Sequence, residues 1–262
     1  MINRRHFTLA AASAAAATAS GPAAAQASPP LTFVLIHGAW HGGWCWSRLA
    51  RLLRADGHQV FAPTLTGLGE RSHLMSDAIT LETHIKDITN VFAFEDLNDA
   101  VLVAHSYGGW PASGALEQLE GRVASVVFVD AFLPENGQRG LDQNSPESIK
   151  AINAALERGE ASRKGPNAAA FGVLPENQAW VDAKMTPQPI GVSLSAITLT
   201  GARDRVPRKS YIRAGLYKQP SFDRYLQERS ATPGWQTQTI ASGHDVMVDH
   251  PDKLYAMLKE LT

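Results

Sequence analysis

Short runs of apolar residues recur along the chain, and most are bounded by Gly, Pro, Asp, Asn or His. Because these runs are apolar at consecutive rather than alternate positions, they predict strands buried on both faces, as in a parallel sheet covered by helices. Six segments have this pattern: LTFVLIHG (31–38), HQVFAPTL (58–65), AVLVAHS (100–106), VASVVFVDAF (123–132), AITLTGARD (196–204) and TQTIASGHD (237–245).

Helical patterns separate the predicted strands. They cover WSRLARLLRADG (46–57), LETHIKDITNVFAF (81–94), GGWPASGALEQL (108–119) and PDKLYAMLKEL (251–261). Strand and helix therefore alternate, which predicts the α/β class with a mostly parallel sheet and helices on both of its faces.

One long segment breaks this alternation. Residues 133 to about 195 contain Pro, Gly and Asn at short intervals and only short helical pieces such as PESIKAINAALERG. Insertions of this length between two strands are usually functional, so we expect a lid over an active site.

The first 27 residues have the pattern of an export signal. Arg4 and Arg5 precede an Ala-rich run that ends in Ala25-Gln26-Ala27, a small-x-small cleavage site. The arginine pair followed by Phe7 resembles a twin-arginine signal. We expect residues 1–27 to be removed, the mature domain to be residues 28–262, and the protein to be periplasmic or secreted.

Composition narrows the function classes. The chain has 262 residues, is 44% hydrophobic and has a formal charge of −1, which suits one large domain and gives no basic excess for binding nucleic acid. The single cysteine, Cys45, excludes an intrachain disulfide and a cysteine-cluster metal site. No segment is long and apolar enough to predict a membrane span. We expect no metal and no cofactor, and the oligomeric state stays open.

Ser106 stands where a predicted strand meets a predicted helix, in VLVAHSYGGW. The residues two before and two after it, Ala104 and Gly108, are small. A sharp turn between a strand and a helix needs small residues there, because the two backbones approach closely. This pattern predicts a nucleophilic serine whose hydroxyl stands clear of the sheet.

An oxyanion hole is predicted beside this serine. LIHGAWHGGWCW (35–46) follows the first strand, and its His-Gly pair lets the backbone present the Ala39 amide toward Ser106. With the Tyr107 amide it would bind the oxyanion of a tetrahedral intermediate. His37 and His41 lack acidic or cysteine neighbours, so a metal site is disfavoured; a ring that ties the loop to nearby backbone is the preferred role of His37.

A serine hydroxyl needs a general base, and the base needs an acid that orients it. His244 follows the last predicted strand, and Asp204 ends the strand before it. Both positions are at strand carboxyl ends, where open α/β sheets bind ligands. We therefore predict Ser106, Asp204 and His244 as catalytic residues. Asp130, at the end of VVFVD, is the alternative acid.

The assembled motifs resemble the α/β-hydrolase superfamily. FVLIHGAWHGGWCWSRLARLLRADGHQVFAPTLTGLGERSHL, VVFVDAFLP and WVDAKMTPQP are similar to small bacterial esterases that hydrolyse pyrethroids or carbendazim, and to plant methyl esterases and hydroxynitrile lyases. This resemblance implies an α/β-hydrolase fold with the same triad and oxyanion amides. Ala104 departs from the glycine common at its position, and many relatives of this type lack a signal peptide.

The sequence thus predicts a serine esterase that forms an acyl-enzyme on a small-molecule hydrophobic, uncharged ester. Aromatic residues near the motifs support an apolar pocket, and neither the serine turn nor the oxyanion loop contains Arg or Lys. Two alternatives stay open: a catalytically silent periplasmic binding protein, and a hydroxynitrile lyase. The lyase is disfavoured because those enzymes carry Thr and Lys where this chain has Gly38 and Asp245.

Overall fold

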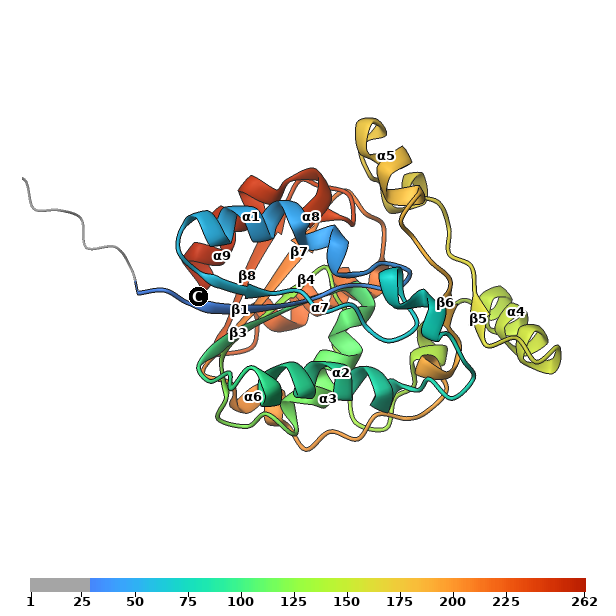
Figure 1. Ribbon diagram of the computed structural model, residues 1–262. Helices are drawn as coiled ribbons and strands as arrows, with labels where there is room; N and C mark the ends of the chain where they lie inside the picture. The colour runs from blue at the N-terminus through green and yellow to red at the C-terminus, as the bar shows by residue number, and fades with distance from the viewer. Residues whose placement is uncertain (1–28) are drawn as a thin grey trace, which may run out of the picture.

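The computed structural model describes residues 29–262, so the predicted signal at residues 1–27 lies outside the described residues. A sheet of six parallel strands forms the centre, in the spatial order β2-β1-β3-β4-β7-β8 (Figure 1). The strands are β1 (Thr32–Ile36), β2 (Gln59–Phe61), β3 (Ala100–His105), β4 (Val123–Val129), β7 (Arg208–Ala214) and β8 (Trp235–Ile240). The predicted α/β class with a parallel sheet is confirmed.

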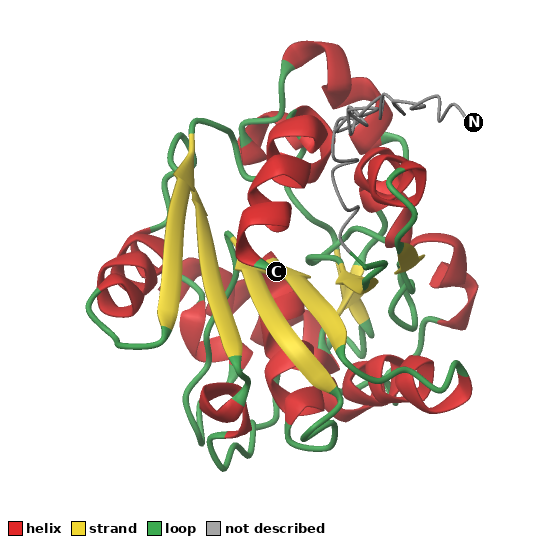
Figure 2. Ribbon diagram, turned by 90° about the vertical axis from the view of Figure 1, so that its left-hand side faces the viewer, coloured by secondary structure: helices red, strands yellow, loops and turns green. Residues whose placement is uncertain are grey.

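Helices cover both faces of this sheet (Figure 2). One face packs against α2 (Leu81–Phe94), α3 (Gly109–Leu116) and α7 (Pro220–Ser230); the other packs against α1 (Ser47–Ala55), α8 (Val246–Asp249) and α9 (Pro251–Leu261). Successive strand residues point to opposite faces, so Leu102 belongs to the first apolar core and Val103 to the second. This explains why the strands are apolar at every position.

The predicted strand at residues 196–204 is wrong. That segment is a loop followed by the short helix α6 (Ala202–Arg205), and the strand that fills this place in the sheet is β7 (Arg208–Ala214). Its sequence, RKSYIRA, carries three cations and does not have the apolar pattern of its neighbours. Arg213 is nevertheless buried there because carboxylates compensate its charge.

After β4, a long segment lies beyond one end of the sheet, to the right in Figure 1, and the chain then returns to α6 before β7. The segment contains α4 (Pro146–Glu157), α5 (Pro175–Asp182) and a two-stranded antiparallel ribbon of β5 (Ser162–Arg163) and β6 (Gln188–Pro189). The short 3-10 helices of the chain are η1 (Gly43–Trp46), η2 (Gly69–Leu74), η3 (Ser106–Gly108), η4 (Gly140–Gln143), η5 (Ala168–Phe171) and η6 (Gly191–Ser193). No helix within residues 29–262 has the length and hydropathy needed to cross a membrane.

Candidate active site

Ser106 lies on a strained turn between β3 and α3. Its φ of 53° is in the left-handed region that residues with a Cβ rarely adopt. Gly108 permits the turn, because a Cβ at this position would lie 2.7 Å from the carbonyl oxygen of His37. Ala104 is fully buried. The close approach predicted from the small residues around Ser106 is therefore present.

His244 connects this serine to a carboxylate. Its Nε2 is 2.8 Å from Ser106 Oγ, and its Nδ1 is 2.6 Å from Asp130 Oδ2. A carboxylate accepts hydrogen bonds, so Nδ1–H is the donor and Nε2 of the neutral ring accepts from the serine hydroxyl. The arrangement has the geometry of a serine hydroxyl next to an oriented general base.

Asp204 does not contact His244, so its prediction as the orienting acid is wrong. It is exposed on α6, which comes before the start of β7. In a parallel sheet the beginning and end of a strand lie at opposite edges, whereas Ser106 follows the end of β3 and His244 that of β8. Asp130, directly after β4, is at the correct edge, and the sequence had offered it as the alternative.

Residues of β7 hold Asp130, which directly follows β4, in place. Its Oδ1 accepts hydrogen bonds from Arg213 Nη1 at 2.6 Å and from the Ala214 amide at 3.0 Å, which leaves Oδ2 for His244. Asp130 has no solvent exposure, and its φ is 44°. A buried carboxylate is stable only when it is paired and hydrogen-bonded, and here both conditions are met.

Aromatic rings surround the imidazole of His244. Tyr217 stacks on it with ring centroids 4.4 Å apart, and Phe171 and Phe222 lie within 6 Å. The His244 amide donates to the Phe171 carbonyl at 2.8 Å. The imidazole is thus packed on several sides, and its orientation is fixed by contacts as well as by Asp130.

The predicted oxyanion loop lies against the serine. Ala39 and Tyr107 line the same pocket as Ser106, and a Cβ on Gly38 would come within 2.8 Å of Ser106 Cβ. His37 donates from Nδ1 to the Gly38 carbonyl and accepts the Leu65 amide at Nε2. Burial lowers the pKa of His37 to about 3, so the neutral ring ties the loop to neighbouring backbone, as predicted.

His41 and Asp245 form a second buried pair beside the site. His41 Nδ1 is 2.8 Å from the Ala39 carbonyl oxygen, and Nε2 is 3.0 Å from Asp245 Oδ2. Both partners only accept, so both ring nitrogens donate and the ring is an imidazolium. Burial opposes this charge, but attraction to Asp245 raises the pKa of His41. The pair connects the oxyanion loop to the residue after His244.

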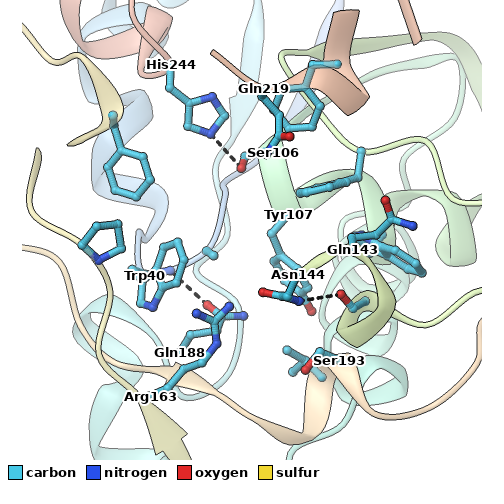
Figure 3. A pocket seen from close by; sticks show the side chains of 18 of the residues that line it. Trp40, Ser106, Tyr107, Gln143, Asn144, Arg163, Gln188, Ser193, Gln219 and His244 are labelled. Carbon is cyan, nitrogen blue, oxygen red and sulfur yellow. Dashed lines mark hydrogen bonds between the residues drawn. The ribbon is translucent and has the colours of Figure 1, made fainter. Parts of the chain in front are cut away.

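A pocket opens from Ser106 toward the inserted segment (Figure 3). Its cavity volume is about 210 Å³, which is smaller than the roughly 300–1,000 Å³ typical of small-molecule sites. The aromatic residues in its lining are Trp40, Tyr107, Trp110, Phe132, Phe171, Tyr217 and Phe222. Trp44, Trp46 and Trp180 pack elsewhere: Trp46 is fully buried, and Trp44 packs edge-on against Trp180.

Polar groups from the inserted segment also reach this pocket. They are Gln143, Asn144, Arg163, Gln188 and Ser193. Within residues 29–262, no three His, Cys, Asp or Glu side chains are grouped as metal ligands would be.

Sequence reasoning missed three residues and one ion pair. Arg213 was hidden because its charged strand was not recognised. Arg163 is far from the motifs in sequence, and Gln188, although it lies within WVDAKMTPQP, has no pattern that marks a role there; the ribbon of β5 and β6 brings both to the pocket. His41 and Asp245 are 204 residues apart in the sequence, so no local pattern predicts their contact.

Comparison with known proteins gives the family. Residues 33–257 match the alpha/beta hydrolase family, so the chain belongs to it, and the predicted fold is confirmed. The chain is 37% identical over 238 residues to a carbendazim hydrolyzing esterase of a Nocardioides species, covering 87% of this chain and 98% of that one. It is 35% identical over 188 residues to methylesterase 1 of Arabidopsis thaliana, covering 71% of this chain and 59% of that one.

The fold is also similar to that of solved structures. An extracellular alpha/beta-hydrolase from a Paenibacillus species aligns with a TM-score of 0.76 and 24% identity, covering 88% of this chain and 99% of that one. A pyrethroid hydrolase from Sphingobium faniae aligns with a TM-score of 0.66 and 19% identity, covering 88% and 96%. With esterases as its relatives, the chain is a carboxylic ester hydrolase.

Proposed function

We propose that the protein cleaves carboxylic esters through an acyl-enzyme formed on Ser106. The observation that carries this proposal is the continuous hydrogen-bonded connection from Ser106 Oγ through His244 to Asp130. Ser106 attacks the ester carbonyl while His244 Nε2 takes its proton and then returns it to the leaving alcohol. Asp130 holds the tautomer and stabilises the imidazolium, and water releases the acid by the same route.

The amides of Ala39 and Tyr107 bind the oxyanion in this scheme. Preorganised donors of this kind commonly account for about 3 kcal/mol of transition-state stabilisation each. Their position beside Ser106 in the pocket supports the role. Gly38 is part of it, because its missing side chain lets the loop lie against the serine.

The aromatic pocket supports substrates with a hydrophobic part, aromatic or bulky and alicyclic. The serine turn and the oxyanion loop contain no Arg or Lys, but the pocket also contains Arg163. The proposed substrate is therefore an ester with a hydrophobic part, and it need not be uncharged. An export signal at residues 1–27 would put the reaction in the periplasm or outside the cell.

A covalent serine probe tests this function directly. A fluorophosphonate should add its mass to the peptide that contains Ser106, and Ser106→Ala should abolish both the labelling and the hydrolysis of p-nitrophenyl esters. A silent binding protein would take up no label and turn over no ester. Release of cyanide from a cyanohydrin, with no ester cleavage, would favour the lyase and contradict the proposal.

A further inference from the structure

Arg163 is the one permanently charged side chain in the lining of the active-site pocket. The described residues that line it include no Asp, Glu or Lys. Within residues 29–262, the ion pairs and hydrogen bonds do not include the Arg163 guanidinium. Burial lowers the pKa of Arg163, so the surroundings disfavour the charged guanidinium. No carboxylate among the described residues compensates this charge. A cation placed this way in a ligand pocket is available to an anion from solution.

Gln188 stands directly opposite Arg163. The two residues are cross-strand partners in the ribbon of β5 and β6, so their side chains lie on the same face. Gln188 is 2% exposed, and its Oε1 accepts the Trp40 amide at 3.0 Å. That contact fixes the orientation of its amide, because only the oxygen can accept. The buried Nε2 then has no described partner and lines the pocket.

Trp40 holds this polar pair in position. The Arg163 guanidinium lies over its ring, 4.7 Å from the centroid, and such contacts restrict a flexible arginine. The Trp40 backbone is itself fixed, since its amide donates to Gln188 and its carbonyl accepts from the Thr186 amide at 2.9 Å. Trp40 follows Ala39, so the pair is connected to the oxyanion loop by one rigid residue.

We propose that Arg163 and Gln188 form a subsite for a carboxylate at the end of the substrate remote from the scissile ester. Figure 3 shows the two side chains on the opposite side of the pocket from Ser106 and His244. The aromatic residues between them suit a hydrophobic middle part. The inference rests on the proposed ester hydrolysis and narrows its substrate class to esters with one free carboxylate.

A carboxylate fits this subsite better than other acceptors. The planar guanidinium fork pairs with two coplanar oxygens, and the Gln188 amide adds a further donor. The single cation neutralises one negative charge, whereas a phosphate dianion would remain half compensated. A neutral carbonyl would leave the guanidinium uncompensated.

Matched p-nitrophenyl esters test the proposal. The half-esters of adipic, pimelic and suberic acid carry a distal carboxylate, and their methyl-capped counterparts have the same chain without the charge. For wild type, we expect kcat/KM to favour the charged member of at least one pair by about tenfold, the value of one charge-assisted hydrogen bond. A preferred chain length is also expected, because the distance from Ser106 to the subsite is fixed.

Two variants should remove this preference. Arg163→Met takes away the charge, and we expect the charged-to-neutral ratio to fall by at least about tenfold. Gln188→Glu keeps the acceptor for the Trp40 amide but replaces the free donor with a negative charge beside Arg163, so the ratio should fall as well. Lys164→Met removes an exposed neighbouring cation outside the pocket and should leave the ratio at its wild-type value.

The outcomes separate the two proposals. If neutral esters are hydrolysed but wild type and Arg163→Met have equal ratios, the carboxylate subsite is overturned and the esterase proposal stands. The same holds if wild type prefers the neutral member of every pair. If no ester is turned over and Ser106 takes up no fluorophosphonate, the esterase proposal fails, and the subsite proposal fails with it.

Discussion

Arg213 and Asp130 form a buried ion pair behind His244, with Nη1 2.6 Å from Oδ1 and neither side chain more than 3% exposed. The other oxygen of Asp130 contacts His244. One carboxylate therefore joins two neighbouring strands of the sheet to the imidazole. Contacts to both carboxylate oxygens fix the orientation of Asp130. A group that holds a histidine in one tautomer needs such a fixed orientation.

Asp130→Asn should lower kcat for p-nitrophenyl esters by at least about 10³-fold, because an amide cannot stabilise the imidazolium and favours the wrong tautomer. Asp204→Asn is the control. It changes an exposed residue on α6, so kcat should stay within about twofold of wild type. A larger loss from Asp204→Asn than from Asp130→Asn would contradict the assignment.

Arg213→Met should destabilise the fold, because it leaves Asp130 buried without a counter-charge. Breaking a buried pair from one side typically costs about 3–5 kcal/mol, measured as the free energy of unfolding in urea. Arg208→Met is a matched change on the exposed first residue of the same strand, and its effect should stay within about 0.5 kcal/mol. Equal effects of the two changes would show that Arg213 does not compensate Asp130.

Most of the fold follows from local patterns. Five of the six predicted strands and all four predicted helices are present, because runs of apolar residues and helix-period patterns report directly on burial. The strand β7 could not be found this way. Arg213 can be buried because Asp130 and Asp223 compensate its charge, and these two residues come from other segments of the chain. In the sequence alone, the charge of Arg213 indicates an exposed position and not a buried strand.

The same error produced the wrong acid. A strand at residues 196–204 would place Asp204 at its carboxyl end, whereas the real strand, β7, begins after Asp204. Ser106 and His244 were predictable because each follows a clearly apolar or terminal strand. The subsite of Arg163 and Gln188 was not, since pairing of two-residue strands leaves no pattern in the sequence.

Stability should fall as the pH is lowered from about 6.5 to 5. Burial holds the pKa of His37 at about 3 and lowers those of His84 and His105. In this range the unfolded chain takes up protons on these rings and the folded chain does not, so acid favours unfolding. Each ring contributes up to about 1.4 kcal/mol per pH unit. Urea denaturation at several pH values measures the slope.

His84→Gln tests the origin of this slope. Glutamine can still donate to the Thr66 carbonyl and accept from the Tyr107 hydroxyl, the two contacts of His84. Glutamine does not titrate. The free energy of unfolding of the variant should therefore depend less steeply on pH, by about the contribution of one histidine. A slope unchanged from wild type would show that His84 is not kept neutral by the fold.

Asp245→Asn should destabilise the protein most between about pH 4 and 6.5. Burial opposes ionisation of Asp245, but His41 lowers the pKa of Asp245. The contribution of Asp245 to stability is therefore complete above about pH 4 and is lost as the pH falls through the folded-state pKa. The raised pKa of His41 makes its contribution complete below about 6.5, and this is lost as the pH rises through the folded pKa. Within that window we expect a cost of about 3 kcal/mol, measured by urea denaturation.

The same change should affect catalysis. His41 holds the Ala39 carbonyl, so a displaced imidazole would let the oxyanion loop shift, and kcat should fall by about tenfold while Ser106 still takes up fluorophosphonate. Asp252→Asn, an exposed change in the first turn of α9, should alter neither quantity. A loss of stability with the same magnitude at pH 5.5 and at pH 9 would contradict the ion pair, because the His41 contribution must diminish as the imidazolium loses its proton.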